Sequence, residues 1–167
     1  MLLLALQAVS AFGDTIQVQH FTFADAEDDL EEIRTLIEAG TLKDPNKLAL
    51  PVDADGLFTY VGTKKFEFPA EYEDDGTPNR WETRDLGVQT SGTITKEGAT
   101  FTVELEYLST QKLSDKIFRT SKGSAVVMPV IKVARTNSSA DFEYGKWKLL
   151  SIAGTKEILA VKVRRDP

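Results

Sequence analysis

The stretch "FEFPAEYEDDGTPNRWETRDLGV", residues 66–88, is the best guide to the fold class because it joins a strand pattern to a turn and to a second strand. Aromatic Phe66 and Phe68 alternate with polar residues, and the run "DDGTPN" at 74–79 then interrupts the alternation. A period of two is typical of a half-exposed strand, and Asp, Gly, Pro and Asn are turn-forming residues. The stretch therefore predicts a strand over 64–72, a turn, and a second strand over 81–95.

Strand patterns continue on both sides of this stretch. Further strands are expected at 15–23, 57–62, 99–108 and 125–137. Residues 99–108 give the clearest pattern, because Phe101, Val103, Leu105 and Tyr107 share one face while Glu104 and Glu106 lie on the other. The phrases "YGKW" and "AGTK" predict hairpin turns between later strands.

The segments between these strands are polar or broken by proline. Residues 41–56 contain Pro45 and Pro51 and are expected to form a connector. Residues 109–124 are polar and are expected to form a long loop with at most one helical turn. Pro129 lies early in the 125–137 segment and predicts a strand edge or a bulge, since proline cannot donate a ladder hydrogen bond.

One segment, residues 25–39, has the period of a helix. Asp25 is the predicted N-cap, Ile33 and Ile37 belong to an apolar stripe, and Gly40 follows the last turn. The sequence thus predicts a single domain over 14–167. Its class is α+β and β-dominated, with one N-terminal helix packed on an antiparallel sheet or sandwich of about seven strands.

Composition limits the function. The 167-residue chain has a net charge of −6 and a sequence pI near 4.9, which argues against nucleic-acid partners because phosphates repel an acidic chain. There are no cysteines, so disulfides and thiolate metal sites are excluded. No stretch approaches 18 apolar residues, which argues against a transmembrane helix.

The first 13 residues, "MLLLALQAVSAFG", combine an apolar run with small residues and predict a secretory signal peptide. The alternative is an apolar first element of the folded domain. If the segment is a signal, the mature protein is exported, to the periplasm or the outer membrane.

Residues that carry chemistry are few. His20 is the only histidine, so we expect a partly exposed strand residue and neither a catalytic triad nor a zinc site. The acidic run at 71–75 lacks calcium-loop spacing and is expected to be a solvated loop. The carboxylates of Glu104 and Glu106 are expected to belong to a polar strand face and not to a glycosidase pair. The sequence therefore predicts no catalytic residues, no metal and no cofactor.

Five phrases in a fixed order carry a family resemblance. They are "FPAEY" (68–72), "TRDLGV" (83–88), "FTVELEYL" (101–108), "MPVIKVARTNSSADFEYGKWKLLSIAG" (128–154) and "EILAVKVRRDP" (157–167). This order resembles the bacterial secretin domain, the C-terminal module of outer-membrane channels in type II secretion and type IV pilus machines. The resemblance covers roughly residues 48–167.

The resemblance marks residues for a shared architecture and not for catalysis. Gly87 is expected to permit unusual backbone angles or close packing, and Arg84 with Asp85 to fix a turn through a charge-assisted hydrogen bond. The family-motif residues are Pro69, Tyr72, Arg84, Asp85, Gly87, Pro129, Arg135 and Gly145. The chain departs from the family where "QTSGTIT" replaces a proline-bearing phrase and "LLSIAG" replaces a double-glycine hairpin.

The resemblance implies a non-enzymatic envelope protein, a structural or accessory subunit of a type IV pilus or type II secretion-type assembly. Its partners would be proteins of that machinery or further copies of itself, with possible association with the outer membrane. The alternative is a free-standing secreted β-sandwich that acts as a binding protein or adhesin. A hydrolase that uses the acidic residues is a third interpretation, for which the sequence shows no nucleophile and base.

Overall fold

The computed structural model describes residues 13–22, 30–42, 47–97, 100–153, 155 and 157–165. Within these ranges the fold is β-dominated, with one short helix and two antiparallel sheets of four strands each, as the sequence predicts. The predicted N-cap Asp25 and residues 1–12 of the predicted signal peptide lie outside the described residues.

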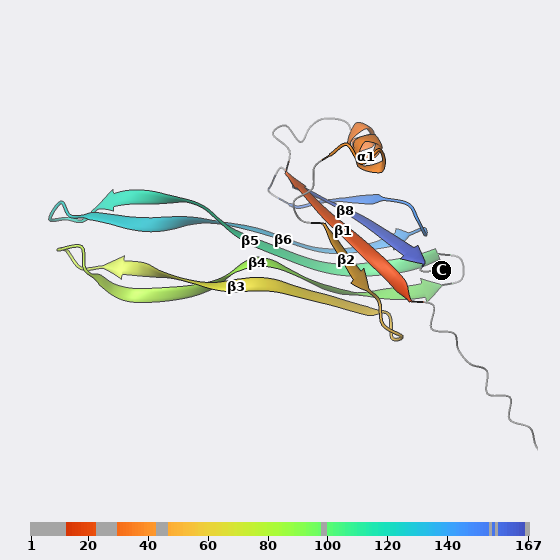
Figure 1. Cartoon of the computed structure of the whole chain (residues 1–167), viewed down its shortest axis with the longest axis horizontal. Coiled ribbons are helices and arrows are strands. Elements are labelled where there is room, and N and C mark those ends of the chain that lie inside the picture. Colours follow the sequence, from red (N-terminus) through yellow and green to blue (C-terminus); the bar gives the residue numbers. More distant parts are fainter. Residues whose placement is uncertain are drawn as a thin grey trace, which may run out of the picture.

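The base sheet has the strand order β2-β1-β8-β7. Its strands are β1 (Asp14–Thr22), β2 (Leu48–Pro51), β7 (Lys148–Ser151) and β8 (Glu157–Arg165). The long sheet has the order β3-β4-β5-β6 and crosses the base sheet (Figure 1). Its strands are β3 (Leu57–Tyr72), β4 (Pro78–Glu97), β5 (Thr100–Arg119) and β6 (Ala125–Phe142).

The base sheet is the middle of three layers. Alternate residues such as Ile16, Val18 and Val161 point toward the long sheet and are fully buried there. The predicted apolar face of β5 meets them, since Phe101, Val103, Leu105 and Tyr107 are all buried in the same cluster. The remaining alternate positions, Ile158 and Ala160 among them, pack under the helix on the opposite face. Because both faces of β8 are covered, it forms the centre of the core.

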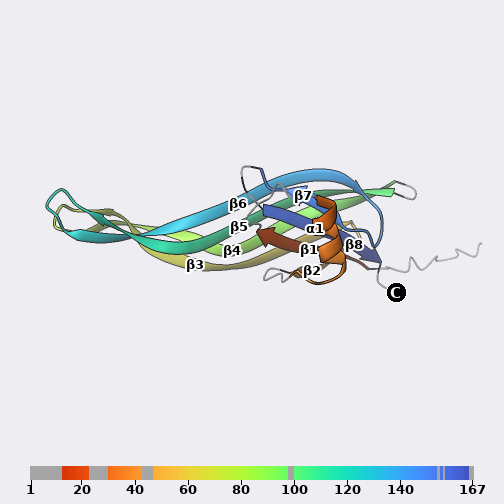
Figure 2. The ribbon, with the colours of Figure 1, turned by 90° about the horizontal axis from the view of Figure 1, so that it is seen from above.

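The helix α1 (Leu30–Glu38) covers the outside of the base sheet (Figure 2). Ile33 and Ile37, one helical turn apart, pack on Phe21 and Ile158. The helix ends at Gly40, whose φ is +67°, and the N–H of Thr41 returns to the carbonyl oxygen of Leu36 at 3.1 Å. This is the glycine-terminated helix end that the sequence predicts.

The long sheet extends well beyond the base. β4 and β5 pair from Glu97–Thr100 only as far as Gly87–Thr110, where the sheet divides. β3–β4 and β5–β6 then continue as two separate hairpins to turns at 73–77 and 120–124. The hairpins lie one above the other in Figure 1 and overlap when seen from above in Figure 2. Together, residues 63–87 and 110–133 form what we call the arm.

The arm corrects one prediction. Residues 109–124 were expected to form a long loop, but β5 runs to Arg119 and only the turn at 120–124 separates it from β6. The reason is exposure, because residues 111–119 are solvent-exposed on both faces and so show no alternation of apolar and polar residues. The strand is held by its backbone ladder with β6 and by cross-strand pairs.

Three smaller differences concern connections. The predicted strands at 57–62 and 64–72 form one continuous strand, β3, and the predicted connector at 41–56 contains β2. "AGTK" does join paired strands, β7 and β8. "YGKW" does not form a hairpin, because β6 and β7 belong to different sheets and the chain passes from one to the other at this turn.

Candidate interaction surface: the two-hairpin arm

The arm begins at Gly87, opposite Thr63 and next to the last pair between β4 and β5. Its φ is +138°, and a Cβ atom added there would lie 2.1 Å from the carbonyl oxygen of Gly62. An L side chain at this position therefore meets both backbone strain and a collision with β3. Gly87 allows the two strands of the first hairpin to approach closely where the sheet divides.

The two hairpins pack against each other through a small apolar inner face. The rings of Phe66 and Phe68 stack at 5.6 Å, and the Nζ atom of Lys112 lies 5.2 Å from the centre of the Phe66 ring. Phe68 and Val126 are buried. The aromatic side chains near the acidic turn are thus divided, since Phe66 and Phe68 pack inward while Trp81 is 55% exposed.

Hydrogen bonds join the two tips. The hydroxyl of Tyr72 donates to the carbonyl oxygen of Val127 at 2.6 Å. Thr120 Oγ1 donates to the carbonyl oxygen of Asp74 at 2.7 Å, and Ser121 Oγ donates to the Asp74 carboxylate at 2.5 Å. These contacts connect residues 46 to 55 positions apart, so they fix one hairpin over the other.

The acidic turn at 73–77 is a folded turn at the surface. The Asp75 carboxylate accepts a 2.9 Å hydrogen bond from the backbone N–H of Thr77, and this bond, with a second from the Thr77 side chain, lowers the pKa of Asp75. No group of His, Cys, Asp and Glu side chains among the described residues could hold a metal ion. The carboxylates of this turn instead accept hydrogen bonds, Asp75 from within the turn and Asp74 from Ser121 at the tip of the other hairpin.

The eight family-motif residues fall in different places. Six belong to the arm, namely Pro69, Tyr72, Arg84, Asp85, Gly87 and Pro129. Pro129 lies opposite Asp115 in β6, which is an edge strand of the long sheet. Arg135 lies outside the arm, opposite Leu108, and Gly145 lies in the β6–β7 turn with a φ of +77°.

Arg84 and Asp85 do not fix a turn. Both lie inside β4, opposite Phe66 and Lys65, and therefore point to opposite faces of the hairpin. Arg84 contacts the carboxylate of Glu82 at 3.8 Å. The expected turn is absent here because the β3–β4 hairpin turns earlier in the chain, at 73–77.

A buried polar cluster lies beneath the arm, between the two sheets. His20 was expected to be partly exposed, but it is only 4% exposed, and its Nδ1 atom shares a 3.1 Å hydrogen bond with the Tyr107 hydroxyl. Glu157 Oε1 accepts from Lys132 Nζ at 2.6 Å and from Thr22 Oγ1 at 3.2 Å, and it lies 3.6 Å from His20 Nε2. The cluster joins the base sheet to β5 and β6.

Burial decides what this cluster can do. Glu157 is 4% exposed and Tyr107 is 2% exposed, so a substrate cannot reach them in this conformation. The sequence held one signal for the cluster, since alternation places His20 on the same face as Ile16 and Val18. The partners Tyr107, Lys132 and Glu157 come from three other strands, and no local pattern connects them.

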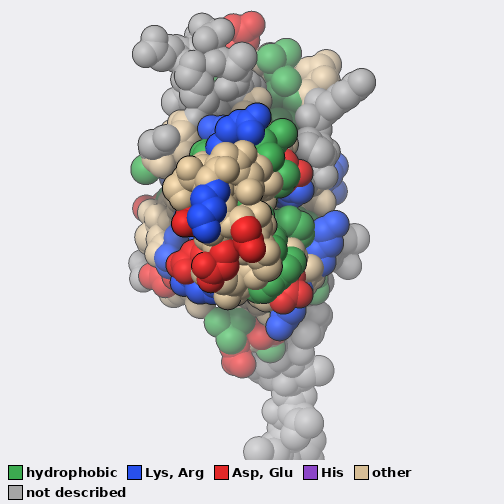
Figure 3. All heavy atoms as spheres, turned by 90° about the vertical axis from the view of Figure 1, so that its left-hand side faces the viewer, with side chains coloured by type: hydrophobic (Ala, Val, Ile, Leu, Met, Phe, Trp, Pro, Cys, Tyr) green, Lys and Arg blue, Asp and Glu red, His purple; other side chains and the backbone are tan. Residues whose placement is uncertain are grey.

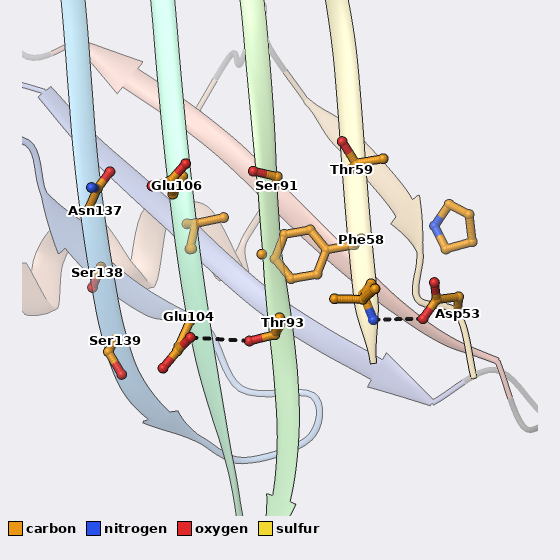
Figure 4. Close-up of a pocket in the computed structure, with 14 residues that line it drawn as sticks. Asp53, Phe58, Thr59, Ser91, Thr93, Glu104, Glu106, Asn137, Ser138 and Ser139 are labelled. Carbon is orange, nitrogen blue, oxygen red and sulfur yellow. Dashed lines mark hydrogen bonds between the residues drawn. The ribbon is translucent and has the colours of Figure 1, made fainter. Parts of the chain in front are cut away.

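An open groove of about 990 Å³ lies on the face of the long sheet that is turned away from the base sheet (Figure 4). Ser91, Glu106 and Asn137 point into it from neighbouring strands, and Thr93 Oγ1 lies 3.4 Å from Glu104 Oε2. The lining holds no histidine, lysine or arginine. Glu104 and Glu106 are thus part of a polar strand face, as predicted.

A comparison of the chain with protein-family models, with curated proteins and with solved structures finds no match. Across the described residues, no helix has the length and apolar character needed to cross a membrane.

Proposed function

We propose that this protein is an exported, non-enzymatic envelope protein that serves as a structural or accessory subunit of a type IV pilus or type II secretion-type assembly. The observation that carries the proposal is the arm, a pair of long hairpins that projects from a compact base and exposes apolar side chains. Six of the eight residues marked by the secretin resemblance belong to it. A projecting hairpin pair of this kind supports a role in contact with other subunits.

The strand edges suit such contacts. β3 and β6 stand at the two ends of the long sheet, and within the described part of the chain each has one side without a strand neighbour. Edge strands present N–H and C=O groups that can pair with another chain, and sheets use such edges in recognition. The base contributes rigidity, because the helix and the base sheet bury the apolar core on the other side of the long sheet.

The partners would be proteins of the secretion or pilus machinery and further copies of this chain, with possible association with the outer membrane. The acidic charge argues against nucleic acid. A head-to-tail contact that closes on itself would give a ring. Binding at surfaces requires neither a cofactor nor a metal.

The native mass of the protein purified from the envelope fraction tests the proposal. We expect an assembly much larger than one 18.5 kDa chain, in buffer or after mild detergent extraction. Electron microscopy of the same fraction should show particles of uniform size. A single-copy mass under both conditions would rule out the self-assembling subunit and favour the free binding protein.

A further inference from the structure

The arm carries an unusually apolar surface on the face of the β5–β6 hairpin that points away from the β3–β4 hairpin. Val126 is buried toward Gly76 of the first hairpin, so its neighbour Val127 points the other way. Ile117 lies directly opposite Val127 in the ladder. We call the outward set the apolar stripe: Ile117 of β5 and Val127, Pro129, Ile131 and Val133 of β6.

These side chains are accessible to solvent in the single chain. Ile117 is 72% exposed, and Val127 and Val133 are about half exposed. Alternation along β6 places Val127, Pro129, Ile131 and Val133 on one face in succession. A contiguous exposed apolar surface of this kind marks an interaction site in a soluble protein.

The two hairpins of the arm carry opposite charge. Residues 110–133 hold five basic side chains and one acidic one, Asp115, whereas residues 63–87 hold seven acidic side chains and four basic ones. We call them the basic hairpin and the acidic hairpin. Figure 3, which looks at the far end of the arm, shows acidic side chains gathered near its centre with basic side chains above them.

The acidic hairpin also has an apolar centre on its outward face. Phe68 is buried on the inner face, and Trp81 lies opposite Pro69, the next residue along, so Trp81 points outward. The same outward face carries Glu67 and Asp85. Each hairpin therefore presents exposed apolar side chains on its outward face. That face also carries Lys65 opposite Asp85 on the acidic hairpin and Asp115 opposite Pro129 on the basic hairpin, so the opposite signs are those of the net charge of each whole hairpin.

We propose that the outward face of the acidic hairpin of a second copy covers the apolar stripe on the basic hairpin. This inference rests on the proposed function, since it names the contact through which copies assemble. The contact inside one chain supports it, because the acidic and basic tips already meet there through Asp74, Ser121 and Lys122. Opposite charges attract the two surfaces, and the apolar side chains lose water on contact.

The contact joins two different surfaces of the chain. It is therefore heterologous and leaves one acidic and one basic hairpin unoccupied in every pair of copies. Repetition of the contact gives a ring if the rotation closes and a filament if it does not. Two basic hairpins or two acidic hairpins would repel each other, so the charges also fix the direction of assembly.

Charge reversal in two separate variants tests this inference. The first variant is Arg119→Glu, at a position that shares the outward face with Ile117, and the second is Glu67→Lys with Asp85→Lys. We expect each variant alone to assemble about 30-fold more weakly than the unmodified protein, and an equimolar mixture of the two to regain assembly, since each then offers the other a complementary surface. Native mass at fixed salt gives the readout.

Two further variants complete the test. Ile117→Asp should weaken assembly by a similar factor while the thermal unfolding temperature stays unchanged, because the side chain is exposed in the single chain. The control is Glu104→Lys with Glu106→Lys, which reverses two charges of the long sheet outside the arm. We expect the control to assemble as the unmodified protein does.

The outcomes separate this inference from the proposed function. If the unmodified protein assembles and all arm variants assemble equally well, the contact named here is wrong and the assembly uses another surface. If the protein has the mass of one copy in both buffer and detergent, this inference and the self-assembling subunit both fail, and an accessory subunit that binds a different protein or a free binding protein is left. If Ile117→Asp leaves assembly unchanged but abolishes binding to phosphatidylglycerol vesicles, the stripe is a lipid contact and the inference is overturned.

Discussion

The hydroxyl of Tyr72, at the end of β3, donates a 2.6 Å hydrogen bond to the backbone carbonyl oxygen of Val127 in β6. The two residues are 55 positions apart and belong to different hairpins. The bond lies beyond the point where β4 and β5 stop pairing, so it replaces part of the ladder that is missing there. The far end of the arm depends on a few side chains of this kind.

Tyr72→Phe should therefore loosen the tips without unfolding the base. The variant keeps the ring and removes one hydrogen bond, which costs about 1 kcal/mol locally. We expect faster amide hydrogen exchange at 120–128 and at 72–77, with the exchange of β8 amides unchanged. Thr83→Val, an exposed change in the same hairpin, should leave the exchange of the tips as it is. Equal protection of the tips in Tyr72→Phe and the unmodified protein would contradict this account.

Gly87→Ala should be among the most destabilising substitutions in the arm. The new Cβ atom would lie 2.1 Å from the Gly62 carbonyl oxygen, at a φ of +138°. Backbone strain alone costs about 1–3 kcal/mol, and the collision with β3 adds to it. Urea unfolding should show a larger loss than for Gly123→Ala, which has a φ of +85° but open space around the added atom. Similar losses in the two variants would mean that β3 moves aside at no cost.

The ion pair between Lys132 and Glu157 allows the effect of burial on the strength of an ion pair to be measured, because an exposed pair with the same N–O distance is available for comparison. Its N–O distance is 2.6 Å with Glu157 buried, and the exposed pair of Lys146 and Glu143 has the same distance. Lys132→Met should cost about 3 kcal/mol, because it leaves a buried carboxylate without its cation. Lys146→Met should cost at most about 0.5 kcal/mol, since solvent screens that pair. Urea unfolding of both variants measures the difference, and equal losses would show that the buried pair contributes no more than the exposed one.

Asp75 should ionise at a lower pH than an ordinary aspartate. Hydrogen bonds from the backbone N–H and the side chain of Thr77 stabilise the charged form and lower its pKa below 3.8. A carboxyl whose pKa is lowered in the folded state adds stability at pH values above its unfolded pKa. That contribution disappears as the pH falls through the folded value. Carbonyl NMR of labelled Asp75 measures the titration.

The matched variant for this titration is Thr77→Ala. It removes the side-chain hydrogen bond and keeps the backbone N–H, so the pKa of Asp75 should rise part of the way toward its ordinary value. A titration of Asp75 at or above 3.8 in the unmodified protein would contradict the turn geometry at 73–77.

Sequence reasoning succeeded where one face of an element is buried. The alternation of Phe101, Val103, Leu105 and Tyr107 identified β5, and the turn residues at 74–79 identified the first hairpin, because burial imposes a period on the sequence. It failed at 111–119, where both faces of the strand meet solvent and no period remains. It also treated "YGKW" as a hairpin turn, since a turn sequence does not reveal which sheet the following strand joins.

The candidate interaction surface was only partly accessible to the same reasoning. Pro69, Tyr72, Gly87 and Pro129 were marked in advance by the family resemblance, and the structure places them all in the arm. The opposite net charges of the two hairpins could not be assigned to two hairpins until the structure showed that 110–119 is strand instead of loop. The cluster of His20, Tyr107 and Glu157 joins three strands through tertiary contacts, which a single sequence does not encode locally.

The division of the sheet at Gly87 has a consequence for how this protein can change over evolution. Since the turns at 73–77 and 120–124 lie far from the base sheet (Figure 1), the length of each hairpin on the tip side of Lys132 is uncoupled from the packing of the base. Inserting two residues into each strand of a hairpin would extend its reach by about 7 Å and keep every side chain on its original face. The reach of the arm could therefore be matched to partners of different size while the same base is retained.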